Sequence, residues 1–357
     1  MAENTVRSHF HEFSSIENLT GKFLKSLEKY GYLNTSVEWV AMEKIHGANF
    51  SFLTDGMEVH VAKRSSILGT ESFYGSAVLA EKYKNDIVEI YRRIKEENPN
   101  ATVVQIFGEL FGGHYPGQKH ASNLKPVQKG VYYKPEVDFL VFDIKMNTDL
   151  VESVDNEGTE KQAWYLSQNE VDKFLDGLTL KGIPVTAKGT IHEIVKLDPV
   201  FITTIPQLYG LPPLLDNMAE GYVFKANQRH PSRRSRPIIK SKNNVKFGEV
   251  RVKIPGEASN NNSTVNGWIN DSLAYCTQNR FNNTISKIGP DSIIPKITGI
   301  YVADVVKDFA KDLELNDEDT AEFEKLIKKI RSGVQSYLIQ NELIEKWLRE
   351  YNMAIKE

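Results

Sequence analysis

The spacing of hydrophobic residues in the first 250 positions alternates between the periods of strands and helices. Apolar residues partly alternate over residues 37–44, which predicts a strand. The runs at 50–53 and 57–62 flank Thr54-Asp55-Gly56, and this pattern predicts a β-hairpin. Residues 76–96 carry apolar side chains at three- and four-residue steps, which indicates an amphipathic helix.

Further along the chain, short apolar runs predict buried strands. β-Branched and aromatic residues dominate these runs, and such residues suit a pleated surface. The expected strands cover residues 103–107, 139–144, 220–226 and 237–242, with one helix at 167–176.

Residues 255–267 (PGEASNNNSTVNG) interrupt this pattern, because a row of small polar residues cannot bury apolar surface. After them the pattern is helical, with helices expected at 268–288, 300–313 and 319–353. We therefore expect an α+β fold class. Its parts are a domain of mixed, mainly antiparallel sheets flanked by helices (1–254), a flexible linker (255–267) and a small all-helical C-terminal domain (268–357).

Composition adds few constraints. The 357 residues are 40% hydrophobic and 25% charged, as in ordinary globular proteins. No run approaches the roughly 18–20 apolar residues of a membrane span, and the polar N-terminus lacks the apolar core of a secretory signal. Cys276 is the single cysteine, which excludes an internal disulfide. We expect a monomer in the cytoplasm, in a host cytoplasm if the chain is phage- or virus-encoded.

Charge is distributed unevenly. Residues 225–253 contain ten basic side chains and one acid, although the whole chain has a net charge of −3. Such a tract indicates a local surface for phosphate groups, and its plainer interpretation is a solvated loop.

Lys44 stands where a predicted strand ends, in Glu43-Lys44-Ile45-His46-Gly47-Ala48-Asn49. A lysine at a strand end is usually a solvated surface group. Here a glycine permits a close turn, and polar side chains follow two and five positions later. Lys240 and Lys242, two apart on a predicted strand, share one face and could stabilise a phosphate. Taken alone, that pair would fit the solvent face of an edge strand.

The segment from Lys44 to Asn49 resembles motif I of the covalent nucleotidyltransferases, and His46 makes it similar to the RNA ligase 2 family of phages and to the RNA-editing ligases of kinetoplastids. The other motifs follow in order along nearly the whole chain, with residues 145–215 the weakest part. Before Lys44 the resemblance already covers Phe13 to Asn18, and after it the matching positions are Arg64, Glu109, Phe142-Asp143, Glu220 to Lys225, Lys240 to Lys242, and Asn279 to Gly289.

The resemblance implies an ATP-dependent RNA ligase. Lys44 would attack ATP and carry AMP, with His46, Lys240 and Lys242 assisting. AMP would then pass to an RNA 5′-phosphate, and a 3′-hydroxyl would displace it, as expected of nick sealing in duplex RNA. The residues expected to bind the nucleotide are Ile45, Asn49, Arg64, Glu109, Phe142, Glu220, Lys225, Lys240 and Lys242.

The same resemblance implies metal and RNA sites. Glu109, Asp143 and Glu220 would hold Mg²⁺, or Mn²⁺ in its place. Arg280, Asp304 and Asp308 would act on the RNA, although the phage enzyme has glutamate where this chain has Asp308. Phe142 would stack on adenine, and its plainer interpretation is a core aromatic.

Two other functions remain open. DNA ligases and capping enzymes share motif I, but they carry aspartate where this chain has His46 and append a β-barrel where helices are expected here. A non-catalytic nucleic-acid-binding module would use the basic tract alone. P-loop and Rossmann motifs do not occur in the sequence.

Overall fold

The computed structural model describes residues 3–18, 21–69, 73–119, 125–154, 158–232, 236–248, 265–289, 291–312 and 321–353. The chain forms two compact units, Met1–Asn243 and Asn244–Glu357. The expected linker lies outside the described residues except for its last three positions, which begin helix α7. The division at Asn244 comes before the one expected at residue 254.

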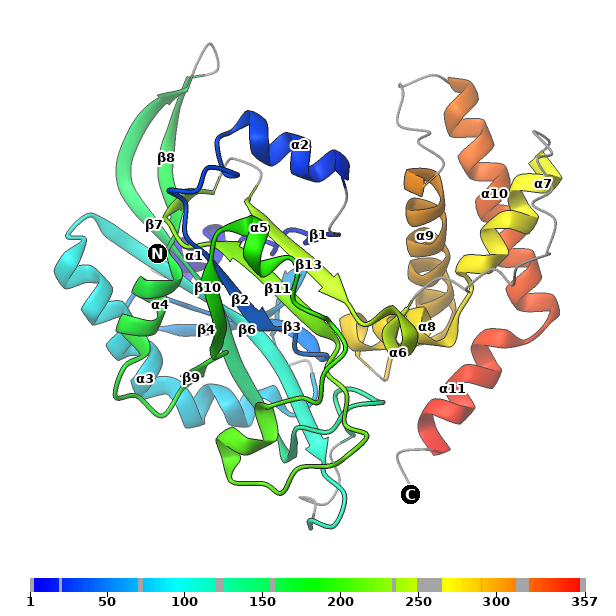
Figure 1. The fold of residues 1–357 in the computed structure, drawn as a ribbon, viewed down its shortest axis with the longest axis horizontal. Helices are drawn as coiled ribbons and strands as arrows, with labels where there is room; N and C mark the ends of the chain where they lie inside the picture. The colour runs from blue at the N-terminus through cyan, green and yellow to red at the C-terminus, as the bar shows by residue number, and fades with distance from the viewer. Residues whose placement is uncertain are drawn as a thin grey trace. The chain divides into compact units, whose positions relative to one another are not determined.

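A five-stranded sheet in the first unit has the order β1-β13-β11-β2-β10. β1 and β13 are parallel, and the other neighbours are antiparallel. The strands are β1 (Glu17–Asn18), β13 (Ile238–Lys242), β11 (Gly221–Ala226), β2 (Trp39–Glu43) and β10 (Val185–Gly189). One face of this sheet buries apolar residues against α2 (Gly21–Lys29) and α5 (Ile191–Ile194) (Figure 1).

The larger sheet has the order β12-β8-β7-β6-β3-β4-β5, and β9 adds to β7. Its strands are β12 (His230–Pro231), β8 (Gly158–Tyr165), β7 (Lys134–Val154), β6 (Ala101–His114), β3 (Ala48–Thr54), β4 (Val59–Lys63), β5 (Ser66–Ile67) and β9 (Lys181–Gly182). The predicted hairpin is confirmed: β3 pairs with β4 through a turn at Gly56, whose φ is 91°. Antiparallel pairing dominates, as expected.

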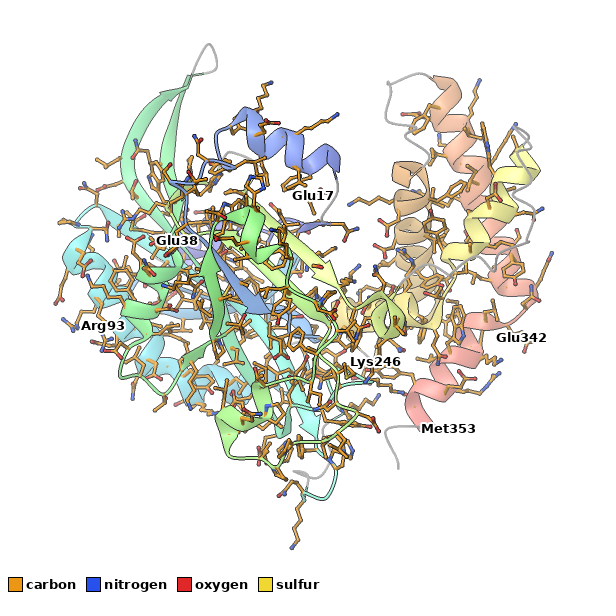
Figure 2. The ribbon with its side chains drawn as sticks, viewed as in Figure 1. Glu17, Glu38, Arg93, Lys246, Glu342 and Met353 are labelled. Atoms are coloured by element: carbon orange, nitrogen blue, oxygen red, sulfur yellow. The ribbon has the colours of Figure 1, made fainter. Side chains whose placement is uncertain are left out.

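Helices α3 (Ser76–Glu97) and α4 (Gln168–Leu175) cover one face of the larger sheet, as Figure 1 shows. Ser167 and Glu170 cap the start of α4 reciprocally. Arg93, labelled in Figure 2, joins the two helices because its Nη1 donates to the carbonyls of Phe174 (3.3 Å) and Asp176 (2.7 Å). The other helices of this unit are α1 (Glu3–Ser8) and the short 3₁₀ helix η1 (Ile205–Tyr209).

The other faces of the two sheets meet at an apolar cluster formed by Phe13, Phe107, Tyr165 and Ile238. Ile238 belongs to the five-stranded sheet, whereas Phe107 and Tyr165 belong to the larger one. Polar side chains that the sequence singled out lie on these same two faces. The seam between the sheets therefore positions the candidate site.

The second unit is helical, as predicted. Its helices are α6 (Asn244–Phe247), α7 (Val265–Ser272), η2 (Leu273–Tyr275), α8 (Gln278–Ile288), α9 (Ile294–Asp312), α10 (Ala321–Gln340) and α11 (Leu343–Met353). They enclose a core that includes Phe281, Tyr301, Val334 and Trp347.

Two helices predicted as continuous are broken. The one expected at 268–288 is divided at Cys276 and Thr277, where the Thr277 hydroxyl caps α8 by accepting from the Arg280 amide. The one expected at 319–353 stops at Gln340, and Glu342 has a φ of 47° before α11 begins. Because the apolar period continues through both breaks, the sequence did not reveal them.

Candidate active site

Lys44 directly follows β2 and is held from both its main chain and its side chain. Its amide donates to the Gly221 carbonyl at 2.8 Å, which extends the pairing of β2 with β11. Its Nζ lies 2.7 Å from Glu220 Oε2, and its side chain is 20% exposed. The lysine is thus fixed in place while its amine stays accessible.

Glu220 collects three basic groups. Besides Lys44, His46 Nδ1 lies 3.3 Å from Oε2 and Lys242 Nζ lies 3.3 Å from Oε1. Burial alone would raise the pKa of Glu220, but Lys44, Lys242 and His46 hold it well below its usual value. Glu220 is therefore ionised at neutral pH.

Gly221 explains how Glu220 reaches this position. Its φ is 135°, and a Cβ there would lie 2.0 Å from the Ser241 carbonyl oxygen. Only glycine fits that space. Since β11 begins at Gly221, the alternation of faces along the strand does not extend back to Glu220.

Three lysines share the face of the small sheet that looks toward the seam. In the register of β11 and β13, Lys240 pairs with Val223 and Lys242 with Gly221, while Lys225 lies two residues beyond Val223. Val223 packs into the seam cluster. β13 is not an edge strand, because β1 pairs with its other side.

Glu109 comes to the same place from the larger sheet. It pairs with Asn49 across β6 and β3, so both side chains project from one face. Burial raises the pKa of Glu109 to about 7; Glu220 adds to the rise, whereas Lys44 and Arg64 oppose it. Lys44, Arg64 and Glu220 therefore all lie near Glu109.

Phe142 and Asp143 project toward the seam together because β7 bulges between them. Phe107 pairs with Asp143 and Gly108 with Val141, which leaves Phe142 as the extra residue. Phe142 is partly exposed and meets Phe13 edge-on, with ring centroids 4.8 Å apart. An ideal strand would have sent one of the two side chains to the opposite face.

Asp143 is fully buried and bound by cations. Lys225 Nζ lies 3.5 Å from its Oδ1 and also donates to the Phe142 carbonyl at 3.2 Å, while Arg236 pairs with Oδ2. Burial lowers the pKa of Lys225, with Asp143 opposing. Lys225 and Glu220, whose relation the sequence left open, therefore belong to separate ion-pair groups.

This arrangement changes the expected metal site. Within the described residues, no group of three or more His, Cys, Asp or Glu side chains is placed to hold a metal ion. Asp143 belongs to the ion-pair group of Lys225 and Arg236, separate from that of Glu220, so the expected trio of Glu109, Asp143 and Glu220 does not form. Glu109 and Glu220 remain as carboxylate donors near Lys44.

The two remaining nucleotide positions of this unit also lie at the site. Arg64 Nη1 donates to the Phe13 carbonyl at 3.0 Å, and its charge acts on Glu109. Ile45, between Lys44 and His46, is 3% exposed. Gly47 brings this turn against β6, because a Cβ there would lie 2.0 Å from the Leu110 carbonyl oxygen.

Four supporting residues escaped the sequence interpretation. The Tyr133 hydroxyl accepts from the His46 amide at 2.9 Å, and burial raises the pKa of that phenol well above its usual value. The Asn217 side chain in turn accepts from the Tyr132 amide at 2.8 Å and donates to its carbonyl at 2.6 Å. Together they hold the turn after Lys44 in place.

Glu43 and Arg236 are the other two. Glu43 is 1% exposed and accepts from Thr203 Oγ1 and from the Thr204 amide at 3.0 Å, which fastens β2 to the loop leading into Glu220. Arg236 stacks 3.8 Å from the Tyr165 ring centroid. No local pattern marks either residue, because their partners are distant in sequence.

Arg280, Asp304 and Asp308 form one ionic group in the second unit. Arg280 is fully buried, and its Nη1 and Nη2 each lie 2.8 Å from an oxygen of Asp304 and Asp308 respectively. Asp308 is 43% exposed and Asp304 is 23% exposed. Asp308, although shorter than the glutamate of the phage enzyme, still reaches Arg280. The exposed surface of this ionic group consists of the two aspartates, because Arg280 itself is buried.

The geometry defines a class of site: an accessible lysine amine next to carboxylates, with further cations on β13 of the same sheet. Such a site can transfer phosphoryl-linked groups through the lysine, since cations neutralise phosphate and a fixed amine attacks it. Separately, no helix among the described residues is long and apolar enough to cross a membrane.

The model of the RNA ligase family matches residues 37–242, and that of the T4 RNA ligase 2 C-terminal domain matches residues 259–342. The chain belongs to the RNA ligase family, and its second unit is of the RNA ligase 2 type.

Among curated relatives, RNA-editing ligase 2 of Trypanosoma brucei brucei mitochondria is 27% identical over 86% of this chain and 84% of its own length. RNA-editing ligase 1 of the same organism is also 27% identical, over 90% and 80%. Among solved structures, a mutant of the Naegleria gruberi RNA ligase with ATP and Mn has a TM-score of 0.41 and 15% identity. That match covers 66% of this chain and 57% of the Naegleria chain, less than two thirds of its length.

Proposed function

We propose that the protein is an ATP-dependent RNA ligase that joins RNA 3′-hydroxyl and 5′-phosphate ends through AMP bound covalently to Lys44. The observation that supports this most directly is the accessible Nζ of Lys44, 2.7 Å from Glu220 Oε2. Membership of the RNA ligase family supports it independently.

In the first step, Lys44 Nζ attacks the α-phosphorus of ATP: an N–P bond forms, a P–O bond breaks and pyrophosphate leaves. Only the neutral amine carries the lone pair for this attack, so the Lys44 ammonium first gives up one proton to solvent or to a nearby base, and the nitrogen gives up a second proton as the N–P bond forms. Lys240 and Lys242, which share the seam face of β13, would neutralise the phosphate oxygens. Glu220 holds the amine in position beforehand.

In the second step, an oxygen of the RNA 5′-phosphate attacks the same phosphorus, and the lysine nitrogen leaves. In the third, the 3′-hydroxyl attacks the RNA 5′-phosphate and AMP departs. Asp304 and Asp308, fixed by Arg280, are proposed to act on the RNA in these steps.

Glu109 and Glu220 suit Mg²⁺ or Mn²⁺, which prefer oxygen ligands. When bound, such an ion would neutralise phosphate oxygens, and the phosphates would complete its coordination.

Labelling with ATP tests the covalent step. The protein is first treated with pyrophosphate to remove bound AMP, then incubated with α-labelled ATP and Mg²⁺ and separated by denaturing electrophoresis. We expect label on the wild type and on Lys84→Ala, an exposed position on α3, and none on Lys44→Ala. Absence of label on the wild type with either Mg²⁺ or Mn²⁺ would overturn the proposal.

We further propose that the substrate is a nick in duplex RNA and that the enzyme acts as a monomer. Sealing is compared for nicks whose 3′-hydroxyl strand is RNA or DNA, and for single-stranded ends. Faster sealing of the RNA nick is expected. Preference for a DNA 3′-hydroxyl would favour a DNA ligase, and preference for single strands would exclude nick sealing. Light scattering tests the monomer against the chain mass of 40.5 kDa.

A further inference from the structure

Residues 9–16, which we call the N-terminal strap, connect α1 to β1 and lie on the seam face of the larger sheet. Gln105 of β6 fastens the strap there. Its Oε1 accepts from the His11 amide at 3.0 Å, and its Nε2 donates to the His11 carbonyl at 3.0 Å. Nε2 also donates to Ser51 Oγ at 3.0 Å. One side-chain amide thus pairs with the strap backbone as a neighbouring strand would.

Gln105 is fully buried. A buried amide without these bonds would cost free energy, so the strap and Gln105 depend on each other. The partners are 94 residues apart, and no local sequence pattern indicates the contact.

Phe13, two residues after His11, contacts Arg64 and Phe142, which the sequence analysis assigned to nucleotide binding. Its carbonyl accepts from Arg64 Nη1 at 3.0 Å, and its ring meets that of Phe142 at 4.8 Å. The ring also packs on Phe107 at 5.1 Å. The direction of the Arg64 side chain therefore depends on where the strap backbone lies.

The plainer interpretation is that the strap only covers apolar surface, as Val6 of α1 does by packing with Leu53 and Val103. Covering alone does not require a paired main-chain clamp, nor does it place a carbonyl against Arg64. The contacts at Phe13 instead lie at the seam, where the larger sheet meets the small sheet.

We propose that the strap is a wall of the nucleotide pocket and that Gln105 is a positioning residue, which holds Phe13 so that Arg64 and Phe142 keep the orientation needed to bind ATP. The inference rests on the proposed function. It concerns binding of the nucleotide, whereas the chemical step depends on Lys44 and its own neighbours.

The test compares Gln105→Leu, which keeps the volume and removes all three hydrogen bonds, with Ser51→Ala, which removes the one bond that does not involve the strap. The rate of lysine labelling is measured over a range of ATP concentrations, with KM taken as the concentration at half of the maximal rate and kcat as the maximal rate. Hydrogen exchange is measured for the amides in residues 9–16 and in α3. For Gln105→Leu we expect KM for ATP to rise about tenfold, kcat to stay within about twofold and the strap amides to exchange faster. Ser51→Ala should resemble the wild type.

The inference would be overturned by any of the following results. A strap that exchanges faster with no change in KM would show that it is not part of the pocket. An unchanged strap with an unchanged KM would show that Gln105 is not its anchor. If the amides of α3 also exchange faster, Gln105→Leu has destabilised the whole unit, and Gln105→Glu is used in its place. A glutamate still accepts from the His11 amide but no longer donates to the His11 carbonyl. A KM for this variant equal to that of the wild type would refute the inference. Failure of the wild type to label would refute the proposed function instead.

Discussion

Glu109 and Glu220 come from different sheets and interact with each other and with Lys44, yet their surroundings shift their pKa values in opposite directions. Burial dominates at Glu109, whereas three basic groups outweigh burial at Glu220. Each residue therefore leaves its own signature in the pH dependence of stability.

For Glu109, the folded pKa of about 7 lies above the unfolded value of about 4.5. The folded state then binds the proton more tightly, so wild-type stability falls as pH rises from about 4.5 to 7. Glu109→Gln should be more stable than the wild type by up to about 3 kcal/mol at pH 8, and nearly equal to it at pH 4. Denaturant unfolding without metal measures this, and an equal difference at both pH values would contradict it.

For Glu220, the folded pKa is depressed, so its stabilisation is present above the unfolded pKa of about 4.5 and declines as pH falls toward the folded value. Glu220→Gln should cost about 1–3 kcal/mol at pH 7, because Lys44 and Lys242 lose their shared carboxylate. The cost should shrink below pH 4.5. The same unfolding experiment checks it; a cost that grows on acidification would show that the ion pairs do not stabilise the fold.

Most residues of the candidate site could be named from the sequence, because the family's motifs occur along the chain in their usual order. Tyr133, Asn217 and Gln105 could not, since each is a polar residue whose partner lies far away in sequence. Arg236 was counted only as part of a basic tract, and a charge run carries no sign that one member is buried against Asp143.

At the scale of elements, short backbone irregularities bring the site together. The bulge in β7 turns Phe142 and Asp143 to one face, and Gly221 begins β11 so that Glu220 points at Lys44. Hydrophobic periodicity predicted most strands, with β6 and β7 longer than expected. It could not predict the bulge, because register depends on the partner strand.

Gly47 tests whether the site depends on the close approach of the turn after Lys44 to β6. A Cβ there would lie 2.0 Å from the Leu110 carbonyl oxygen, so Gly47→Ala must push the turn after Lys44 away from β6. We expect a loss of about 2–4 kcal/mol of stability and at least tenfold slower labelling. The control is Gly69→Ala, because among the described residues, its chain neighbours aside, no atom lies within 4 Å of the place that a Cβ would take there. Thermal unfolding measures the loss of stability, and the rate of labelling with ATP measures the effect on the site. If Gly47→Ala matched Gly69→Ala in both measurements, the steric argument would be refuted.

At the scale of the whole molecule, the two units have separate cores. The first contains the lysine site, and the second contains the Arg280 group. The change to helical periodicity predicted two parts. The boundary expected at residue 254 stays a prediction, because it lies outside the described residues.

Gly299 probes the independence of the units. It lies within α9, and apart from the helix's own backbone no atom of the described residues lies within 4 Å of the place that a Cβ would take. Gly299→Ala should therefore stabilise the second unit by about 0.5–1 kcal/mol. Hydrogen exchange of α9 and α10 should slow while that of α3 stays unchanged. Equal slowing in α3 would mean that the units unfold as one.

The contact between Lys44 and Glu220 spans 176 residues of sequence. On a ribosome that adds about 5–20 residues per second, the lysine is synthesised roughly 9–35 s before its carboxylate. Lys242, another partner of Glu220, follows later still. A nascent or prematurely terminated chain therefore carries the nucleophile without the groups that hold it, and the enzyme cannot begin to consume nucleotide before the first unit has been completed.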